Sequence, residues 1–320
     1  MIFEKQIINM YKSMAYTRCD DNGTAFYFSA EDFPNLKSES FSFKSSLGHT
    51  LSGCFYFYDN PKEKRIIVFE HGFGSGHSAY MKEIEKLAKH GYLVFSYDHT
   101  GCMQSGGTSP NGMAQSLADL NDCITALKSV ERLSEFDISV VGHSWGGFST
   151  LNIPSLHPDI SHIVVFSGFV SVHELIKSYF PSLLMVYRKP IMELERAANP
   201  KFVYFNAVNS LKNSNVKALL IYSENDKLCS KKHYEILKNG LVEKQNIKTK
   251  LVFNKGHNPN YTTEAVKHLN EYLKAKSTLM KKKKLVTDEQ KRAFLLSFDW
   301  NRMTEQDESV WEDVFECLDN

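Results

Sequence analysis

The chain has 320 residues, 42% of them hydrophobic, and its 38 Lys and Arg residues nearly balance its 37 Asp and Glu residues, which gives a net charge of +1. This length and apolar content suit one large core with insertions better than two independent domains. The balanced charge gives no sign of the basic face that nucleic-acid binding normally needs, so we expect no nucleic-acid partner. Because Met1–Lys5 lack the apolar core of a signal peptide and no apolar run approaches the ~18 residues of a membrane span, we expect a cytoplasmic protein without stable membrane insertion.

The first part of the chain predicts an extension followed by a hairpin. Residues 1–40 are irregular and rich in aromatic side chains, with one predicted helix over 4–14. Alternating aromatic residues at 40–44 and 51–57 flank a turn that contains a glycine, which is typical of a β-hairpin. We expect the main domain to begin here and to extend over residues 41–276.

Apolar runs then alternate with helical patterns. The runs have the continuous apolar character of strands buried on both faces and lie at 65–70, 92–97, 137–141, 162–168, 216–222 and 249–253. Between them, the apolar spacing at 79–90 and 117–133 is that of amphipathic helices. This alternation predicts an α/β fold with a mostly parallel central sheet and helices on both faces.

The run at 137–141 continues directly into Gly142-His143-Ser144-Trp145-Gly146-Gly147. A β-branched run that breaks into Gly-x-Ser-x-Gly is the sequence form of a nucleophile elbow, a sharp turn from a strand into a helix. The glycines let the turn close without Cβ clashes, and the start of the helix directs free N–H groups toward the serine. Pro154 predicts that this helix ends or kinks near Ile153. Ser144 is therefore the candidate nucleophile.

A serine nucleophile needs a base, and two later strands end in suitable residues. The run at 216–222 is followed by Ser223-Glu224-Asn225-Asp226, and the run at 249–253 by Asn254-Lys255-Gly256-His257. His257 is the candidate base for the Ser144 proton. Asp226 is the candidate acid that holds the histidine tautomer and stabilises its charged form, with Glu224 as the alternative.

The reaction also needs two N–H donors, because the tetrahedral intermediates of acyl transfer carry negative charge on an oxygen. One candidate donor is the backbone N–H of Trp145, the residue after the nucleophile. The other is the N–H of Phe73, in the loop His71-Gly72-Phe73-Gly74 that follows the run at 65–70.

Several of these motifs together resemble the α/β-hydrolase superfamily. They stand at the ends of predicted strands and comprise His71–Gly74, Asp98–Gly101, Gly142–Gly147, Asp226 and His257. Over roughly 41–275 the chain is most similar to small esterases and monoacylglycerol-lipase-like serine hydrolases, including bacterial cinnamoyl esterases. The resemblance implies the α/β-hydrolase fold, and it favours Asp226 over Glu224 because relatives place the acid just before a small apolar segment. The chain departs from the pattern at Cys102, where relatives often have a second glycine and a serine close behind.

Residues 169–215 form a long insertion between two predicted strands, and a connection of this length usually carries function. Relatives have a lid or cap here, so the resemblance implies a small helical cap over the catalytic serine. The candidate pocket-lining residues are Tyr179, Phe180, Met185 and Tyr187. The alternative is that these side chains only complete the core.

The tail from Lys281 differs in composition from the main domain. The run Lys281–Lys284 favours a solvated linker over a contact with an anionic membrane or nucleic acid, because many carboxylates lie nearby. The patterns at 288–298 and 308–318 predict two short amphipathic helices in an extension over 281–320. Their aromatic side chains would pack on the main domain or on a second copy of the chain, in a homo-oligomer.

The motifs predict a serine hydrolase that cleaves a small-molecule carboxylic ester through an acyl-enzyme. Two alternatives remain open. A peptidase or amidase of the same fold would need an anchor for the peptide amino terminus, for which Glu193 and Glu195 are the candidates. A non-catalytic binding module of this fold is the second.

The six cysteines show no paired spacing, so we expect reduced thiols. The twelve histidines include no His-x-x-x-His pair, and no Cys-x-x-Cys cluster occurs. We therefore expect no catalytic metal and no cofactor.

Overall fold

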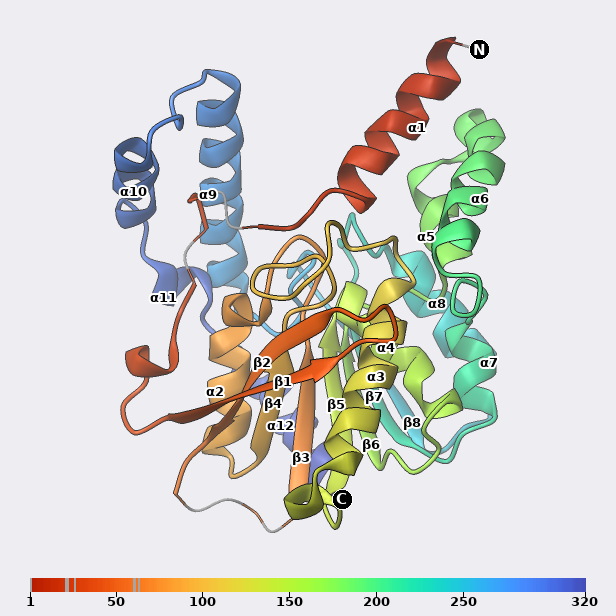
Figure 1. Cartoon of the computed structure of the whole chain (residues 1–320), viewed down its shortest axis with the longest axis vertical. Helices are drawn as coiled ribbons and strands as arrows, with labels where there is room; N and C mark the ends of the chain where they lie inside the picture. Colours follow the sequence, from red (N-terminus) through yellow and green to blue (C-terminus); the bar gives the residue numbers. More distant parts are fainter. Residues whose placement is uncertain (1, 21–22, 26, 60–61, 63) are drawn as a thin grey trace.

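The computed structural model describes residues 2–20, 23–25, 27–59, 62 and 64–320. The strands of this part of the chain form one eight-stranded sheet in the order β1-β2-β4-β3-β5-β6-β7-β8 (Figure 1). The pairs β1–β2 and β2–β4 are antiparallel, and all the other neighbours are parallel. The strands are β1 (Lys37–Lys44), β2 (Thr50–Phe57), β3 (Arg65–Glu70), β4 (Leu93–Tyr97), β5 (Asp137–His143), β6 (His162–Phe166), β7 (Lys217–Ser223) and β8 (Ile247–Val252).

Successive side chains of the central strands point to opposite faces of the sheet, and each face has its own core. Ile66 and Val68 of β3 join the core beneath α3, α4 and α8, whereas Ile67 and Phe69 join the core beneath α2 and α12. These helices are α2 (Met81–Lys89), α3 (Gln115–Ser129), α4 (Trp145–Asn152), α8 (Lys231–Gly240) and α12 (Glu308–Asp319). Helices therefore cover both faces of a mostly parallel sheet, which confirms the expected α/β class.

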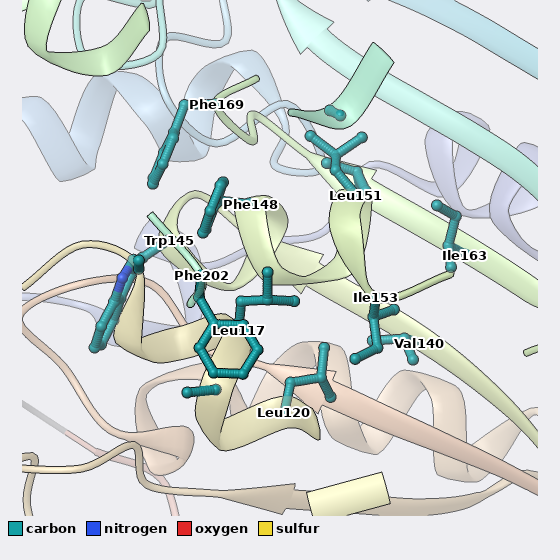
Figure 2. Packing of buried hydrophobic residues seen from close by; sticks show 14 of the residues in the cluster. Leu117, Leu120, Val140, Trp145, Phe148, Leu151, Ile153, Ile163, Phe169 and Phe202 are labelled. Atoms are coloured by element: carbon teal, nitrogen blue, oxygen red, sulfur yellow. The ribbon is translucent and has the colours of Figure 1, made fainter. Parts of the chain in front are cut away.

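Helix α4 lies in the middle of one core (Figure 2). Every residue of α4 is buried, and the ring of Phe148 stacks on that of Phe169 with 4.7 Å between ring centroids. The helix ends at Asn152 and continues into a 3₁₀ turn over Ile153–Ser155 that contains Pro154, which confirms the expected end of the helix. This packing holds the start of α4 in a fixed position against the sheet.

The insertion between β6 and β7 contains α5 (Val172–Tyr179), the 3₁₀ helix η5 (Ser182–Tyr187), α6 (Arg188–Ala198) and α7 (Ala207–Lys212). Figure 1 shows α5 and α6 above the sheet, beside the N-terminal helix α1 (Ile2–Ala15). Helix α7 instead packs against α4. The cap is thus made of α5, η5 and α6, and α1 adjoins it.

The C-terminal part leaves the sheet along α9 (Thr263–Lys281) and returns to it. Helices α10 (Asp288–Leu296) and α11 (Trp300–Met303) pack on α9 through a small apolar cluster. Helix α12 then packs on one face of the sheet, where Trp311 is fully buried. The expected helices at 288–298 and 308–318 correspond to α10 and α12, and α12 packs on the main domain.

None of the helices in the described residues combines the length and apolar character that crossing a bilayer requires.

Candidate active site

Ser144 stands at the turn between β5 and α4 in a strained conformation, with φ 57° and ψ −108°. A positive φ at a non-glycine residue costs about 1–3 kcal/mol and persists only where the surrounding structure enforces it. The close packing of the turn does so, because a Cβ on Gly142 would come within 2.2 Å of Thr150 Oγ1 and one on Gly146 within 2.3 Å of the Glu70 carbonyl oxygen. The turn therefore requires glycine on both sides of Ser144.

His257 and Asp226 lie together, as the sequence predicted. His257 Nδ1 donates to Asp226 Oδ2 at 2.8 Å, and the Asp226 side chain is fully buried. The other carboxylate oxygen accepts from the N–H groups of Leu228 and Cys229 at 2.8 and 3.1 Å. Glu224 is exposed, and no hydrogen bond or ion pair joins it to His257, although both residues are described. The structure therefore brings Asp226, and not Glu224, to His257.

The Ser144 hydroxyl faces a residue that sequence reasoning missed. It contacts the thiol of Cys229, which lies three residues after Asp226, and burial raises the pKa of that thiol. No hydrogen bond joins Ser144 to His257, although both residues are described. Nothing in the local sequence marks Cys229 as a contact of the elbow, because the contact depends on how the loop after β7 folds back.

The two candidate oxyanion donors are adjacent. The rings of Phe73 and Trp145 pack edge to face with 5.0 Å between centroids, and both residues line a cavity with Ser144. Trp145 is the first residue of α4, so its N–H precedes the first hydrogen bond of the helix. Phe73 and Trp145, the residues expected to supply the two backbone donors, therefore lie beside the candidate nucleophile.

The cavity at Ser144 is small and apolar, about 50 Å³. Pockets for drug-sized ligands are typically about 300–1,000 Å³. Its lining comes from the elbow, the cap and the N-terminal helix: Met14, Phe73, Met113, Ser144, Trp145, Phe169, Leu175, Tyr179 and Cys229.

Only one of the four candidate pocket residues lines this cavity. Tyr179 does, at the end of α5. Phe180 is buried in the main core, Met185 is 59% exposed on η5, and Tyr187 packs against the core from outside. The 3₁₀ helix η5, which follows Pro181, has no buried residue, so Met185 faces solvent and does not reach the cavity.

A chain of hydrogen bonds connects the loop His71–Gly74, the candidate oxyanion loop, to the loop Asn254–His257, the histidine loop. The Gly72 N–H donates to the Tyr80 hydroxyl at 3.0 Å, and Tyr80 lies 2.8 Å from His143 Nδ1. His143 Nε2 lies 2.7 Å from the carbonyl oxygen of His257. Because a carbonyl only accepts, Nε2 carries the proton and Nδ1 accepts from Tyr80. Burial and the charge of His257 lower the pKa of His143 to about 3, so the ring stays neutral.

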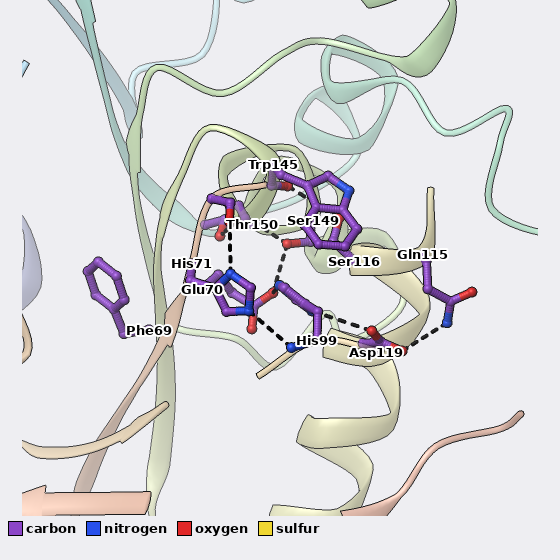
Figure 3. Close-up of polar contacts among 12 residues, drawn as sticks. Phe69, Glu70, His71, His99, Gln115, Ser116, Asp119, Trp145, Ser149 and Thr150 are labelled. Carbon is purple, nitrogen blue, oxygen red and sulfur yellow. Dashed lines mark hydrogen bonds and ion pairs between the residues drawn. The ribbon is translucent and has the colours of Figure 1, made fainter. Parts of the chain in front are cut away.

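A buried ionic network lies beneath the loop that carries Phe73 (Figure 3). The His99 ring lies between Glu70 and Asp119, at 3.3 and 3.5 Å, and all three side chains are fully buried. Burial alone would lower the pKa of His99, but the charges of the two carboxylates raise it. The His99 backbone N–H also donates to His71 Nε2 at 3.0 Å, so this network supports the loop that carries Phe73.

Glu193 and Glu195 of α6 do not form a paired anchor. Glu193 is exposed, whereas Glu195 is fully buried. Glu195 accepts hydrogen bonds from the hydroxyls of Tyr11 and Tyr16 and from the backbone N–H of Met113. Both of its oxygens are occupied by groups of this chain, so it offers no free site for a peptide amino group.

Among the described residues, no group of three or more His, Cys, Asp or Glu side chains is arranged to hold a metal ion.

Comparisons with known proteins agree with this architecture. Residues 61–204 match a family model described as Hydrolase_4, serine aminopeptidase S33. Similar solved structures include an esterase from Pyrococcus furiosus, with a TM-score of 0.59 and 19% identity over 83% of this chain and 97% of that one. The α/β hydrolase GrgF from a Penicillium species has a TM-score of 0.52 and 17% identity over 77% of this chain and 98% of that one.

A puromycin-hydrolysing peptidase from Mycobacterium tuberculosis has a TM-score of 0.54 and 13% identity, over 69% of this chain and 36% of that one. No curated protein sequence matches the chain. Identities this low establish similarity of fold. The strand order, the elbow and these similarities together identify the chain as a protein with the α/β-hydrolase fold.

Proposed function

We propose that the protein is a serine hydrolase that cleaves small carboxylic esters through an acyl-enzyme, with Ser144, His257 and Asp226 as its triad. The observation that carries the proposal is the strained Ser144, which lines one cavity with Phe73 and Trp145. Backbone strain of this kind is typical of functional sites. At such a site the strained turn holds a side chain in an orientation that an unstrained backbone would not give it.

The reaction begins when Ser144 Oγ attacks the ester carbonyl carbon. Its proton passes to His257 Nε2, because Nδ1 is already committed to Asp226. The hydroxyl must first turn from Cys229 toward the imidazole, and catalytic hydrogen bonds often tighten only in the substrate complex. The N–H groups of Phe73 and Trp145 stabilise the oxyanion, at about 2.7–4 kcal/mol for each donor.

The tetrahedral intermediate then collapses and the alcohol leaves with the proton held on His257. A water molecule gives a proton to the same nitrogen and attacks the acyl-enzyme carbonyl. Collapse of the second intermediate releases the acid and returns the proton to Ser144. Asp226, fixed by two backbone donors, keeps His257 in the tautomer that each step requires.

The surroundings of Glu195 support an ester substrate over a peptide. The peptidase alternative relied on carboxylates near the cap, and one of them is saturated by Tyr11, Tyr16 and Met113. Glu195 is therefore not free to bind a substrate ammonium group. We therefore expect turnover of short-chain p-nitrophenyl esters to exceed that of aminoacyl p-nitroanilides; the reverse order would favour the peptidase.

The test is a Ser144→Ala variant assayed with p-nitrophenyl acetate and with a fluorophosphonate probe. Loss of the nucleophile is expected to lower kcat by about 10⁶-fold and to abolish labelling. Ser182→Ala, which removes an exposed hydroxyl on η5, is the matched control and should behave as the wild type. Turnover retained by Ser144→Ala would overturn the proposal, and a wild type that is neither active nor labelled would favour the binding module.

A further inference from the structure

The N-terminal helix reaches the active site, although it lies outside the alternation of strands and helices. Figure 1 shows α1 beside α5 and α6 above the sheet. Tyr11 and Ala15 of α1 are buried in the main core, at 3% and 0% exposure. Met14, which is 40% exposed, lines the cavity that contains Ser144. A side chain of α1 therefore forms part of the cavity rim.

A buried carboxylate fastens α1 to the cap and to the elbow. Glu195 of α6 accepts from the Tyr11 hydroxyl at 2.7 Å and from the Tyr16 hydroxyl at 3.2 Å. Its second oxygen accepts from the Met113 N–H at 2.7 Å, and the Met113 carbonyl accepts from Trp145 Nε1 at 2.7 Å. One carboxylate thus joins three segments that are distant in sequence, and the chain of contacts ends at a candidate oxyanion residue.

A second attachment lies just after the helix. Arg18 donates to three backbone carbonyls, those of Met103, Ser105 and Gly107. Cys19 pairs with Cys102 as an isolated parallel bridge, through hydrogen bonds of 2.9 Å from Cys19 N to Gly101 O and from Met103 N to Cys19 O. The segment is therefore held at both ends of the stretch that carries Met14.

We propose that residues 2–20 form a strap that closes the acyl-binding cavity, with Met14 as the residue that limits the length of the acyl group and Glu195 as the clamp that holds the strap. This inference rests on the proposed function, because it assigns the cavity beside Ser144 to the acyl group. The substrates that fit are esters of short carboxylic acids, since the cavity of about 50 Å³ ends at the strap.

The chemistry of the clamp favours a carboxylate. Glu195 accepts on two oxygens from two hydroxyls and one N–H. A glutamine would present one oxygen and one NH₂ group, so either its NH₂ group would face the Met113 N–H, or both hydroxyls would have to accept from it and lose their present acceptor. Burial raises the pKa of Glu195, and the hydrogen bonds that the clamp donates offset only part of that rise.

The first experiment measures kcat/KM for p-nitrophenyl acetate, butyrate and octanoate. In Met14→Ala we expect the octanoate-to-acetate ratio to rise by about 10-fold or more, which is the typical worth of a methylene contact in an apolar pocket. Met10→Ala is the matched control, because Met10 lies one turn earlier on α1, is 62% exposed and does not line the cavity. It should leave the ratio unchanged.

The second experiment loosens the clamp. Glu195→Gln should raise the same ratio, whereas Glu193→Gln, an exposed change two residues away on α6, should not. Tyr11→Phe removes one hydrogen bond and keeps the buried ring, so it tests the clamp if Glu195→Gln does not fold. An unchanged ratio in both Met14→Ala and the folded clamp variant would overturn the strap.

Failure of the strap can be told from failure of the proposed function. Rates of Ser144 labelling by alkyl fluorophosphonates with short and long alkyl groups give a readout without ester turnover. A wild type that is labelled and active, but whose chain-length preference is the same in all variants, overturns the strap alone. A wild type that is neither labelled nor active overturns the proposed function and the strap with it.

Discussion

The candidate reaction centre and the wall of the proposed acyl cavity lie side by side but are built differently. The candidate catalytic groups Ser144, Asp226 and His257 follow strands β5, β7 and β8, so the parallel sheet brings them to one edge. The wall combines residues such as Met14, Met113 and Tyr179 from three segments that no sheet aligns. The first region is positioned by backbone pairing and the second by side-chain hydrogen bonds.

This difference in construction predicts what a substitution in each region should change. A substitution at a strand end should alter the chemistry and leave the position of the strand end unchanged, because each strand is held by hydrogen bonds to its neighbours. A change in the wall should alter its position, because side-chain contacts such as the Glu195 clamp help to hold it. The experiments on Met14 and Glu195 test the second region, and the following predictions test the first.

The largest effect is expected at the acid. Asp226→Asn should lower kcat by about 10⁴-fold with little change in stability, because it removes the acceptor that fixes the His257 tautomer. Glu224→Gln, two residues earlier and exposed, should leave kcat unchanged in the same steady-state assay. A large loss in the Glu224 variant would move the acid role to that residue.

The buried network beneath the oxyanion loop should have the largest effect on stability. His99→Gln leaves Glu70 and Asp119 without their cation, and breaking a buried charge pair in this way costs about 3–5 kcal/mol. Urea unfolding measures the loss. His173→Gln, a 55% exposed histidine on α5, is the control and should cost little. Equal stability of the two variants would contradict the ionic role of His99.

The connection between the two loops should have an intermediate effect on catalysis. Tyr80→Phe removes the hydroxyl that accepts from Gly72 and donates to His143, so both the oxyanion loop and His257 can shift. Small misplacements of catalytic groups cost about 10²-fold or less in kcat. Tyr58→Phe, which deletes a hydroxyl bonded to Glu85, should not change kcat. A loss seen only in KM would argue against a positioning role.

The smallest effect concerns pH. Burial lowers the pKa of His77, but its hydrogen bond to Asp98 and the charge of that residue outweigh burial and raise the pKa from 6.5 to about 9. The protonated ring therefore stabilises the fold fully below pH 6.5, and this contribution is lost as the pH rises through 9. The same ion pair lowers the pKa of Asp98 from 3.8 to about 2, so its contribution is lost as the pH falls below 3.8 toward 2.

The measurement is the free energy of unfolding in urea for the wild type and His77→Gln, at about pH 6 and about pH 9.5. At about pH 6 the wild type should have a larger free energy of unfolding than His77→Gln. This difference between the two proteins should shrink at about pH 9.5. A difference that grows with pH would contradict the ion pair.

The local sequence was sufficient to predict the alternation of strands and helices, the elbow at Ser144 and the end of α4 just before Pro154. Each depends on a few consecutive residues, because glycine spacing, β-branched runs and proline act on the backbone where they stand. The local sequence also predicted that His257 lies in the loop after the last strand of the sheet. It did not separate Asp226 from Glu224 without the resemblance, since both follow the same strand two residues apart.

The wall of the cavity was decided only by the tertiary structure. Met14 lies on a helix that the sequence treated as an extension, whereas Phe180 is buried in the core and Met185 is exposed on η5, so neither lines the cavity. Glu195 looked like a substrate anchor on α6 and instead accepts from Tyr11 and Tyr16. These contacts join residues up to 184 positions apart. No local pattern encodes such a pairing, because side-chain hydrogen bonds depend on the final packing of the segments and carry no sequence period.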